Sequence, residues 1–525
     1  GDHRDLHSFP TRRSSDLTTV YDIPYDDAWE LVTKCFSYTN HTVMSEALET
    51  WSFSIMSSVL PCITNIILDI NWNFMNRVQK FFATDPGIIG IMQDLSIFSS
   101  DPDKHVRMAN LAIIGSHTVN GVSELHTQIL RNNVFHTFCK MDSAKFINVT
   151  NGVTPRRWLL QCNPFLSKLI TDTIQTDEWV TNLSLLSLLR DYATDPEVQQ
   201  AWETAHLQAK KRLAVYIQKT QGISIPESFL FDVMVKRIHE YKRQLLDILY
   251  CIYRYQWIKG MTEEERSHVV PRVVIFGGKA APSYHRAKNI IKLINNVSEV
   301  VNNDPAMKDY LRIVFVPDYS VSKAELIIPA ADITQHISTA GTEASGTSNM
   351  KSALNGGLLV GTYDGATIEI CTAIGKENVF FFGHREEEIR QMRKELRAYG
   401  NEQRATTISN ELSMVLGQLM MNGFGSASLM KEIIDSICFG NDWYGVTFDF
   451  DQYVSIQREV DRVWRDRSEW NKRSILSTAG MGCFSSDNTI MNYCSRVWEV
   501  EPCHRPNYVK EKTSRQRSQI GRAHV

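Results

Sequence analysis

The second half of the chain alternates short apolar runs with amphipathic segments. Patterns of helical period separate the runs, at residues 244–255, 284–301 and 322–328. The apolar runs themselves cover residues 229–235, 273–276, 311–316, 358–361 and 379–382. This alternation is typical of a doubly wound sheet of parallel strands, and such sheets bind ligands beyond the carboxyl ends of their strands. We therefore expect an α/β domain whose functional residues follow the strands.

The first part of the chain has mainly helical periodicity. Apolar residues recur at helical spacing in residues 20–51, 52–93 and 105–133, with a polar interruption at 38–42. A turn-rich break follows at residues 148–158, and Ser485-Ser486-Asp487 supplies an N-cap for a last helix at 486–498. We therefore predict a mainly helical part at 18–150, an α/β domain at 151–485, a C-terminal helical part at 486–509 and tails outside them.

Composition sets broad limits. A chain of 525 residues is too long for one hydrophobic core, so two or more domains are expected. With 56 basic and 59 acidic residues the net charge is −3, which indicates neither a nucleic-acid nor a membrane partner. No apolar run is long enough to span a bilayer. The 10 cysteines form no CxxC pair, so we expect reduced thiols and no bound metal.

The two ends differ in composition from the residues beside them. Residues 1–17 and about 510–525 are basic and low in apolar content, and they resemble translated sequencing-adaptor sequence. We expect them to be foreign tails and exclude them from the fold prediction. A natural disordered basic tail is the alternative. The first residues also lack the apolar core of a secretory signal.

The strongest candidate for chemistry is the stretch Gly341-Thr342-Glu343-Ala344-Ser345-Gly346-Thr347-Ser348-Asn349-Met350-Lys351. Its small and polar residues predict a turn that enters a short helix near Thr347 and ends at Asn355-Gly356. N–H groups and hydroxyls at such a turn favour an anion. A lysine one turn further, beside a bound phosphate, suggests an aldehyde cofactor in Schiff-base linkage. Alone, the segment fits a polar loop with a surface lysine equally well.

The same segment resembles the pyridoxal-phosphate lysine signature of the glycogen and α-glucan phosphorylases. Residues 355–366 resemble the family's continuation, and the likeness extends from about residue 22 to 502. The resemblance implies a two-domain α/β glycosyltransferase of the GT-B type, with a complete Rossmann-like C-terminal domain and a truncated N-terminal domain. It also implies pyridoxal 5′-phosphate as the cofactor, bound as a Schiff base to Lys351.

A second group of chemical interest follows the expected strand that ends at residue 235. The segment 236–243 holds four cations in eight residues, which suits a phosphate. The solvated start of a helix is as good an interpretation in isolation. The resemblance implies that Lys236 contacts the cofactor phosphate and that Tyr241 contacts a sugar hydroxyl. It implies that Arg237 and Lys242 contact the substrate phosphate, and these two form the catalytic set with Lys351.

The resemblance also assigns the remaining site residues. The sugar contacts are His41, Asn151 and Glu343 with the backbone groups of Ser345 and Gly346. The further cofactor contacts are Thr347, Ser348, Tyr319 and Trp158. Without the resemblance, His41 and Trp158 are more simply structural residues. Ser320 is a departure, because animal members often carry an arginine there that helps to hold the cofactor phosphate.

The family's reaction accounts for the number of cations. A phosphate monoester carries about −1.5 to −2 charges at neutral pH, and the family mechanism places inorganic phosphate beside the cofactor phosphate. Two such groups can approach only when cations compensate them or a proton is shared, which a second pKa of about 6 allows. The resemblance implies phosphorolysis of terminal α-1,4-glucosyl units to α-glucose 1-phosphate with retention. The cofactor phosphate serves as proton donor and acceptor, in place of a glycosidase's two carboxylates.

Family members carry a long region before residue 20 that supplies a glycine loop above the cofactor phosphate. Because this chain lacks it, we expect weak or no turnover. The alternative is a catalytically inactive fragment that retains only cofactor or glucan binding. An aminotransferase-like enzyme is a third hypothesis, although no partner for the pyridine nitrogen is visible. The expected partners are inorganic phosphate and α-1,4-glucan, without nucleic acid or membrane, in the cytoplasm. Whether the family's homodimer forms is left open.

Overall fold

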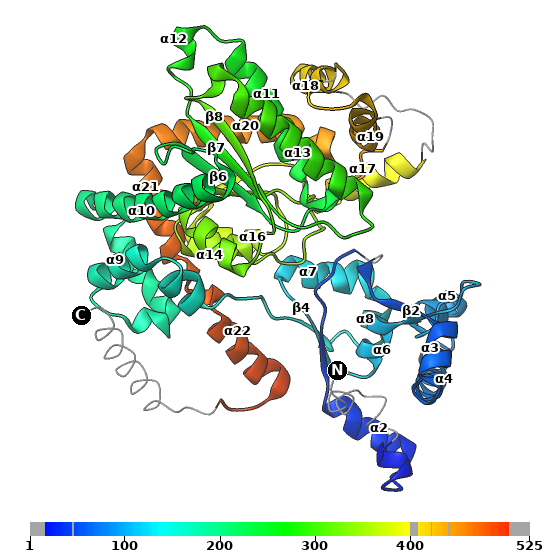
Figure 1. The fold of residues 1–525 in the computed structure, drawn as a ribbon. Coiled ribbons are helices and arrows are strands. Elements are labelled where there is room, and N and C mark those ends of the chain that lie inside the picture. The colour runs from blue at the N-terminus through cyan, green and yellow to red at the C-terminus, as the bar shows by residue number, and fades with distance from the viewer. Residues whose placement is uncertain (1–15, 45–46, 399–407, 422, 439–440, 503–525) are drawn as a thin grey trace.

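The computed structural model describes residues 16–44, 47–398, 408–421, 423–438 and 441–502. These residues form two α/β units, a smaller N-terminal one and a larger C-terminal one, which lie side by side in Figure 1. Nearly all of the expected foreign ends, residues 1–17 and 510–525, lie outside the described residues, so their origin stays a prediction.

The C-terminal unit is built on a parallel sheet of six strands in the order β11-β10-β9-β6-β7-β8. β6 and β7 are buried along their whole length, as continuous apolar runs predict for strands covered on both faces. The sequence pattern predicted every strand of this sheet except β9. The strands are β6 (Leu230–Val235), β7 (Arg272–Gly277), β8 (Leu311–Val316), β9 (Ile333–His336), β10 (Leu358–Gly361) and β11 (Val379–Phe381).

Helices cover both faces of this sheet, so the predicted doubly wound α/β fold is confirmed (Figure 1). Successive residues of β6 point to opposite faces: Leu230 and Met234 join one core, while Phe231 and Val233 join the other. The first core packs under α11 (Gln244–Lys259), α13 (His285–Asn303), α18 (Asn410–Met420), α19 (Ala427–Ile437) and α20 (Val446–Arg465). The second packs under α10 (Pro196–Gln221) and α14 (Val321–Ala330).

A third core extends from β10 and β11 to the helices around the candidate site. It contains Trp158 and Met350, which belong to a π-helical turn (Arg156–Gln161) and to α15. The helices of this core are α9 (Pro164–Ile174), α15 (Ser348–Leu354), α16 (Thr367–Ile374) and α21 (Arg467–Ala479). Two more helices, α12 (Glu263–Arg266) and α17 (Glu386–Ala398), complete the unit.

The N-terminal unit is less helical than its pattern predicts. The helix expected over residues 20–51 is wrong beyond Lys34, and strands β3 and β4 interrupt the block expected at 105–133. Strands of three or four residues are too short to show a period of two. The strands form a parallel sheet, β1 (Ser37–Thr39), β4 (Thr118–Gly121), β5 (Phe146–Asn148), and an antiparallel pair, β2 (Thr50–Ser52) with β3 (His105–Arg107). The helices are α2 (Tyr25–Lys34), α3 (Phe53–Val59), α4 (Pro61–Phe81), α5 (Ile88–Leu95), α6 (Met108–Ile114), α7 (Glu124–Ile129) and α8 (His136–Met141).

The chain crosses between the units at two points that pair with each other. Val153 and Ser485 form a parallel β-bridge. The Ser485 hydroxyl caps α22 (Ser486–Tyr493) by accepting a hydrogen bond of 3.0 Å from the Asn488 N–H. α22 ends against the N-terminal unit, where the Tyr493 hydroxyl accepts a 3.1 Å bond from Asn120 Nδ2. The domain boundaries at residues 150 and 485 stay predictions.

Two whole-chain properties complete the description. Among the described residues, no helix combines the length and apolarity needed to cross a lipid bilayer. Cysteines 35, 62, 139, 162, 251, 371, 438, 483 and 494 are all free thiols, and Cys503 lies outside the described residues.

Candidate active site

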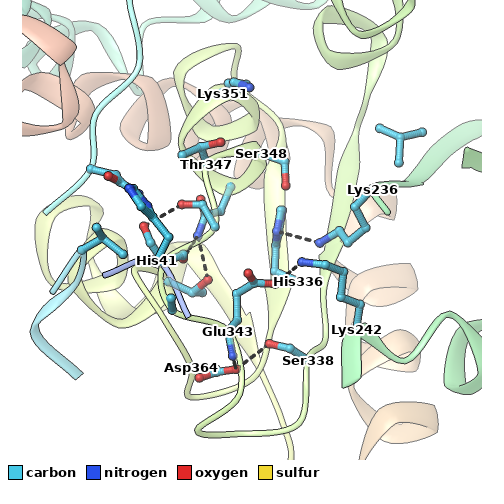
Figure 2. Close-up of a pocket in the computed structure, with 18 of the residues that line it drawn as sticks. His41, Lys236, Lys242, His336, Ser338, Glu343, Thr347, Ser348, Lys351 and Asp364 are labelled. Carbon is cyan, nitrogen blue, oxygen red and sulfur yellow. Dashed lines mark hydrogen bonds and ion pairs between the residues drawn. The ribbon is translucent and has the colours of Figure 1, made fainter. Parts of the chain in front are cut away.

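A cavity of about 360 Å³ lies beyond the carboxyl ends of β6 and β9, next to the N-terminal unit (Figure 2). Val235 ends β6 and His336 ends β9, and both line the cavity. It is therefore at the edge of the sheet where ligands of this fold class bind. The predicted site residues that line it are His41, Asn151, Lys236, Lys242, Tyr319, Glu343, Ser345, Gly346, Thr347, Ser348 and Lys351.

Three predicted site residues do not line the cavity. Tyr241 stands behind Glu343 and donates a 3.4 Å hydrogen bond to its Oε1. Trp158 is buried beneath Lys351. Arg237 is exposed, and its carbonyl accepts a 3.0 Å bond from Gln244 Nε2. The roles assigned to these three residues stay predictions.

Lys351 lies on α15 with its amine over an aromatic ring. Its Nζ is 4.1 Å from the ring centroid of Trp158. The helix is fixed to this platform because Asn355 Nδ2, at its end, donates a 2.6 Å bond to the Trp158 carbonyl. Burial lowers the pKa of Lys351 below its usual 10.5. In the part of the chain that the structure describes, no group hydrogen-bonds to this amine, so it is available as a nucleophile.

Two hydroxyls precede Lys351 at the start of α15. Thr347 is the N-cap residue, yet its side chain makes no capping bond. Among the described residues, neither the Thr347 nor the Ser348 hydroxyl has a hydrogen-bond partner, and both face the cavity. α15 has only seven residues, so these two hydroxyls, rather than a long helix dipole, are the groups suited to an anion at its start.

Lys236 and Lys242 supply the positive charge of the cavity. The Lys236 amine donates 2.8 Å to the Gln335 carbonyl and lies 3.3 Å from His336 Nδ1. Burial, helped by the charge of Lys242, lowers the pKa of Lys236 to about 7. Burial also acts against the charge of Lys242, but its ion pair with Glu343 and the nearby Tyr241 hydroxyl raise its pKa.

Glu343 is held by its ion pair with Lys242 on one side and by its own backbone on the other (Figure 2). The Glu343 N–H donates 2.9 Å to Asp364 Oδ2, and the Ser338 hydroxyl donates 2.7 Å to the same oxygen. The Gly341 N–H donates 3.0 Å to Oδ1. Burial raises the pKa of Asp364 to about 6. Asp364 thus fixes the loop that carries Glu343.

Glycines give this loop its shape. Gly341 and Gly346 adopt φ of +81° and +73°, a conformation that side chains other than glycine rarely adopt. The Gly277-Gly278 pair at the end of β7 does not line the cavity in the described structure. A Cβ at Gly278 would lie 2.0 Å from the Lys236 carbonyl oxygen. Gly278 therefore allows the segment that carries Lys236 to pack closely.

The N-terminal unit contributes His41 and Val122 to the cavity. The buried His126 fixes the loop after His41, since its Nε2 lies 3.0 Å from the Thr42 carbonyl. The units are joined directly at the site: the Ser123 hydroxyl donates 2.5 Å to the Ala344 carbonyl, and the Thr150 hydroxyl donates 2.6 Å to Glu369 Oε1.

Sequence reasoning missed His336, Ser338 and Asp364, all of which line the cavity. Asp364 lies three residues beyond the predicted strand at 358–361, a position that could have indicated it. His336 is the last residue of β9 and Ser338 follows this strand, which the pattern did not predict. No pattern in the sequence therefore indicated that His336 and Ser338 belong to the site.

A Rossmann-like parallel sheet beside a second α/β unit, with a cavity lined by lysine and hydroxyl side chains next to both, defines a fold of the GT-B class. The chain belongs to the carbohydrate phosphorylase family, whose model matches residues 15–500.

Curated relatives agree with this membership. The chain is 47% identical over 494 residues to "Glycogen phosphorylase 2" of Dictyostelium discoideum, and the match covers 94% of this chain and 48% of that protein. It is 46% identical over 484 residues to "Alpha-glucan phosphorylase 2, cytosolic" of Arabidopsis thaliana, and the match covers 92% of this chain and 57% of that protein. It is 45% identical over 505 residues to "Glycogen phosphorylase" of Saccharomyces cerevisiae, and the match covers 93% of this chain and 55% of that protein. The chain thus spans about half the length of the curated relatives it matches.

The family implies pyridoxal 5′-phosphate, and the residues present fit that group. The half-buried Lys351 amine suits its aldehyde, and the aromatic ring of Tyr319, which lines the cavity, suits a flat ring. The Thr347 and Ser348 hydroxyls and the Lys236 amine suit its phosphate. Ser320 is partly exposed and its hydroxyl oxygen lies 3.1 Å from that of Ser322; as a serine it adds no positive charge for the phosphate.

Proposed function

We propose that this chain carries the cofactor half of an α-1,4-glucan phosphorylase. The reaction is the phosphorolysis of terminal α-1,4-glucosyl units of a glucan by inorganic phosphate. It releases α-glucose 1-phosphate with retention of configuration. The observation that carries this proposal is one cavity. In it the half-buried Lys351 amine and the Thr347 and Ser348 hydroxyls have no hydrogen-bond partner among the described residues, and Lys242 pairs with Glu343 near Lys236.

The proposed cofactor is pyridoxal 5′-phosphate. Lys351 would hold its aldehyde, Trp158 and Tyr319 its ring, and the group of Lys236, Thr347 and Ser348 its phosphate. When bound, this phosphate supplies an acid–base group beside the substrate phosphate.

The chain's own residues bind and orient the two substrates. Lys242 and Arg237 attract inorganic phosphate, and their positive charge allows a second anion nearby. His41, Asn151, Tyr241 and Glu343, with backbone groups of Ser345 and Gly346, hold the glucosyl hydroxyls. Substrate phosphate gives its proton to the glycosidic oxygen as the C1–O bond breaks, and a phosphate oxygen then bonds to C1 from the same face.

The role of Glu343 separates this mechanism from that of a glycosidase. Two flanking carboxylates, one acid and one nucleophile or base, are the usual glycosidase pair. In the described cavity Glu343 is engaged by Lys242 and Tyr241, and Asp364 is engaged by the loop backbone. Neither is free to attack a sugar, which supports phosphate as the nucleophile.

Cofactor loading and turnover test the proposal separately. The purified chain is mixed with pyridoxal 5′-phosphate, reduced with borohydride and digested, and mass spectrometry should find the label on Lys351. Lys351→Ala should lose the label and the associated absorbance. Lys279→Ala is the control, because this exposed lysine follows β7 and pairs with Asp318. A label spread over surface lysines would overturn the assignment.

Turnover is then measured as phosphate-dependent release of glucose 1-phosphate from glycogen and from maltodextrin. If release of glucose 1-phosphate requires both phosphate and Lys351, the result supports the proposal that this chain is an active phosphorylase. A chain that carries the label on Lys351 but releases nothing supports the alternative function of a fragment that only binds cofactor or glucan. We propose the cytoplasm as its location, since the Arabidopsis relative is named cytosolic. The homodimer of the family is a proposal that sedimentation can test.

A further inference from the structure

His336 is a buried histidine at the end of β9 whose ring lies between Lys236 and the helix that carries Lys351. It is 8% exposed and lines the cavity. Its Nδ1 lies 3.3 Å from Lys236 Nζ, and its Nε2 lies 2.7 Å from the Thr334 hydroxyl oxygen. Figure 2 shows the ring directed at the Lys236 amine.

The tautomer of His336 follows from the bonds around it. The Thr334 hydroxyl donates its hydrogen to Ser352 Oγ at 2.9 Å. Because that single hydrogen is used, the Thr334 oxygen can only accept from the ring, so the proton of His336 is on Nε2. Nδ1 is then an acceptor and receives a hydrogen from the Lys236 amine.

Burial, together with the charges of Lys236 and Lys242, lowers the pKa of His336 well below its usual 6.5 and keeps the ring neutral. An acceptor at Nδ1 is therefore available at neutral pH. A charged lysine amine has three hydrogens. The Gln335 carbonyl takes one and His336 takes the second, so the third is directed at the cavity.

We propose that His336 is a positioning residue that aims the Lys236 amine at a bound phosphate, and that Thr334 and Ser352 set its tautomer. Ser352 is adjacent to Lys351, so the hydrogen-bond chain from Ser352 through Thr334 and His336 to Lys236 ties the two lysines together. This inference rests on the proposed function, because it takes the cavity to be a phosphate site.

The tautomer can be tested directly in the chain with no ligand. Nitrogen-15 NMR of labelled imidazole rings distinguishes a protonated Nε2 from a protonated Nδ1, and His336→Gln identifies the signal. We expect His336 to carry its proton on Nε2. Thr334→Val removes the acceptor without a large change in volume, and should produce a mixture of tautomers. A ring protonated on Nδ1 in the unaltered chain would overturn the proposal.

The effect on the anion is tested with inorganic phosphate, titrated by calorimetry into the chain without added cofactor. His336→Leu should weaken binding about tenfold, the factor expected for loss of one hydrogen bond to a charged group. His336→Gln keeps an oxygen acceptor and should restore most of the affinity. His206→Gln is the control, since His206 contacts Asp332 at the opposite end of β9.

Lys236→Ala separates this inference from the proposed function. If Lys236→Ala binds phosphate as tightly as the unaltered chain, the phosphate site itself is wrong. If Lys236→Ala weakens binding and His336→Leu does not, the site stands and the role of His336 is wrong. If His336→Leu fails to fold, the difference between Thr334→Val and the unaltered chain gives the answer, because the ring is then retained.

Discussion

The Lys351 amine lies 4.1 Å above the centroid of the Trp158 ring, and burial around this contact lowers the pKa of the lysine. A neutral amine is the reactive form toward an aldehyde. Trp158→Ala would admit water beneath the amine and raise its pKa. We expect pyridoxal 5′-phosphate to react with Lys351 several-fold more slowly in Trp158→Ala than in the unaltered chain at neutral pH. The absorbance of the product measures this rate.

Trp158→Phe is the matched control for that experiment, because it keeps an apolar ring beneath the amine. It should react at nearly the rate of the unaltered chain. Circular dichroism must show both variants folded, since truncation of a buried tryptophan costs about 3–5 kcal/mol. Equal slowing in both variants would show that the ring acts on the packing of α15 rather than on the amine.

Phosphate binding should take up a proton above pH 7, because burial lowers the pKa of Lys236 to about 7. Above about pH 7 the Lys236 amine of the folded chain is therefore mostly neutral, whereas an ordinary lysine stays charged up to about pH 10.5. A bound anion favours the charged amine and so recovers that proton. Affinity should therefore fall as pH rises through 7.

Calorimetry at pH 8 in two buffers of different ionisation enthalpy measures this uptake. Lys236→Arg is the control, because a guanidinium stays charged throughout this range. Fewer protons should be taken up on phosphate binding in Lys236→Arg, and the difference from the unaltered chain is the contribution of Lys236. Identical uptake in both chains would assign the proton to another group, such as phosphate itself.

Much of this site could be predicted from the sequence because its residues follow strands with clear apolar runs. The stretch 341–351 and the cations after Val235 are examples. β9 could not be predicted, since Thr334 and Gln335 are polar side chains in a buried strand. Gln335 is satisfied by a 2.7 Å bond to Asp232, about one hundred residues away in the chain. Such a partner is visible only in three dimensions.

The same reason explains the missed roles of His336 and Asp364. Each acts through another residue, Lys236 and the backbone of Glu343 respectively, and no local pattern records such a contact. The short strands of the N-terminal unit are a different case. They are held by the parallel register of β1, β4 and β5, which segments of three or four residues do not reveal.

Asp364→Asn should destabilise the chain by about 1–3 kcal/mol, because the new amide would place N–H groups against backbone donors. It should also weaken sugar binding, since the Glu343 loop loses its anchor. Denaturant unfolding and glucose titration measure the two effects. Asp442→Asn is the control: this buried carboxylate accepts comparable bonds from Val446 and Thr447 at the start of α20. A loss of sugar affinity in both variants would refute a local role for Asp364.

Glu343→Gln should change the affinities for the two substrates in opposite directions. The amide leaves Lys242 without its charge partner, so phosphate should bind a few-fold more tightly. Glucose should bind about tenfold more weakly, because a charge-assisted hydrogen bond to its hydroxyls is lost. Parallel titrations with both ligands measure this, and Glu325→Gln, which alters a peripheral pair with Arg157, is the control. Weakening of both ligands would mean that Glu343 mainly supports the cavity.

Asp461→Ala tests whether the chain can lose stability without a change in the chemistry of its candidate site. Asp461 accepts bonds of 2.8 Å from Arg254 and 2.8 Å from Arg272, both buried beneath α20. Removal of one partner from a buried ion pair costs about 3–5 kcal/mol, because the remaining charge is left uncompensated. We expect a loss of this size in denaturant unfolding, whereas the label on Lys351 and the phosphate affinity should not change below the transition. Arg272 also contacts Asp232, which holds Gln335 on β9. A drop in phosphate affinity in the folded variant would therefore show that the core sets the position of β9, and through it of Lys236.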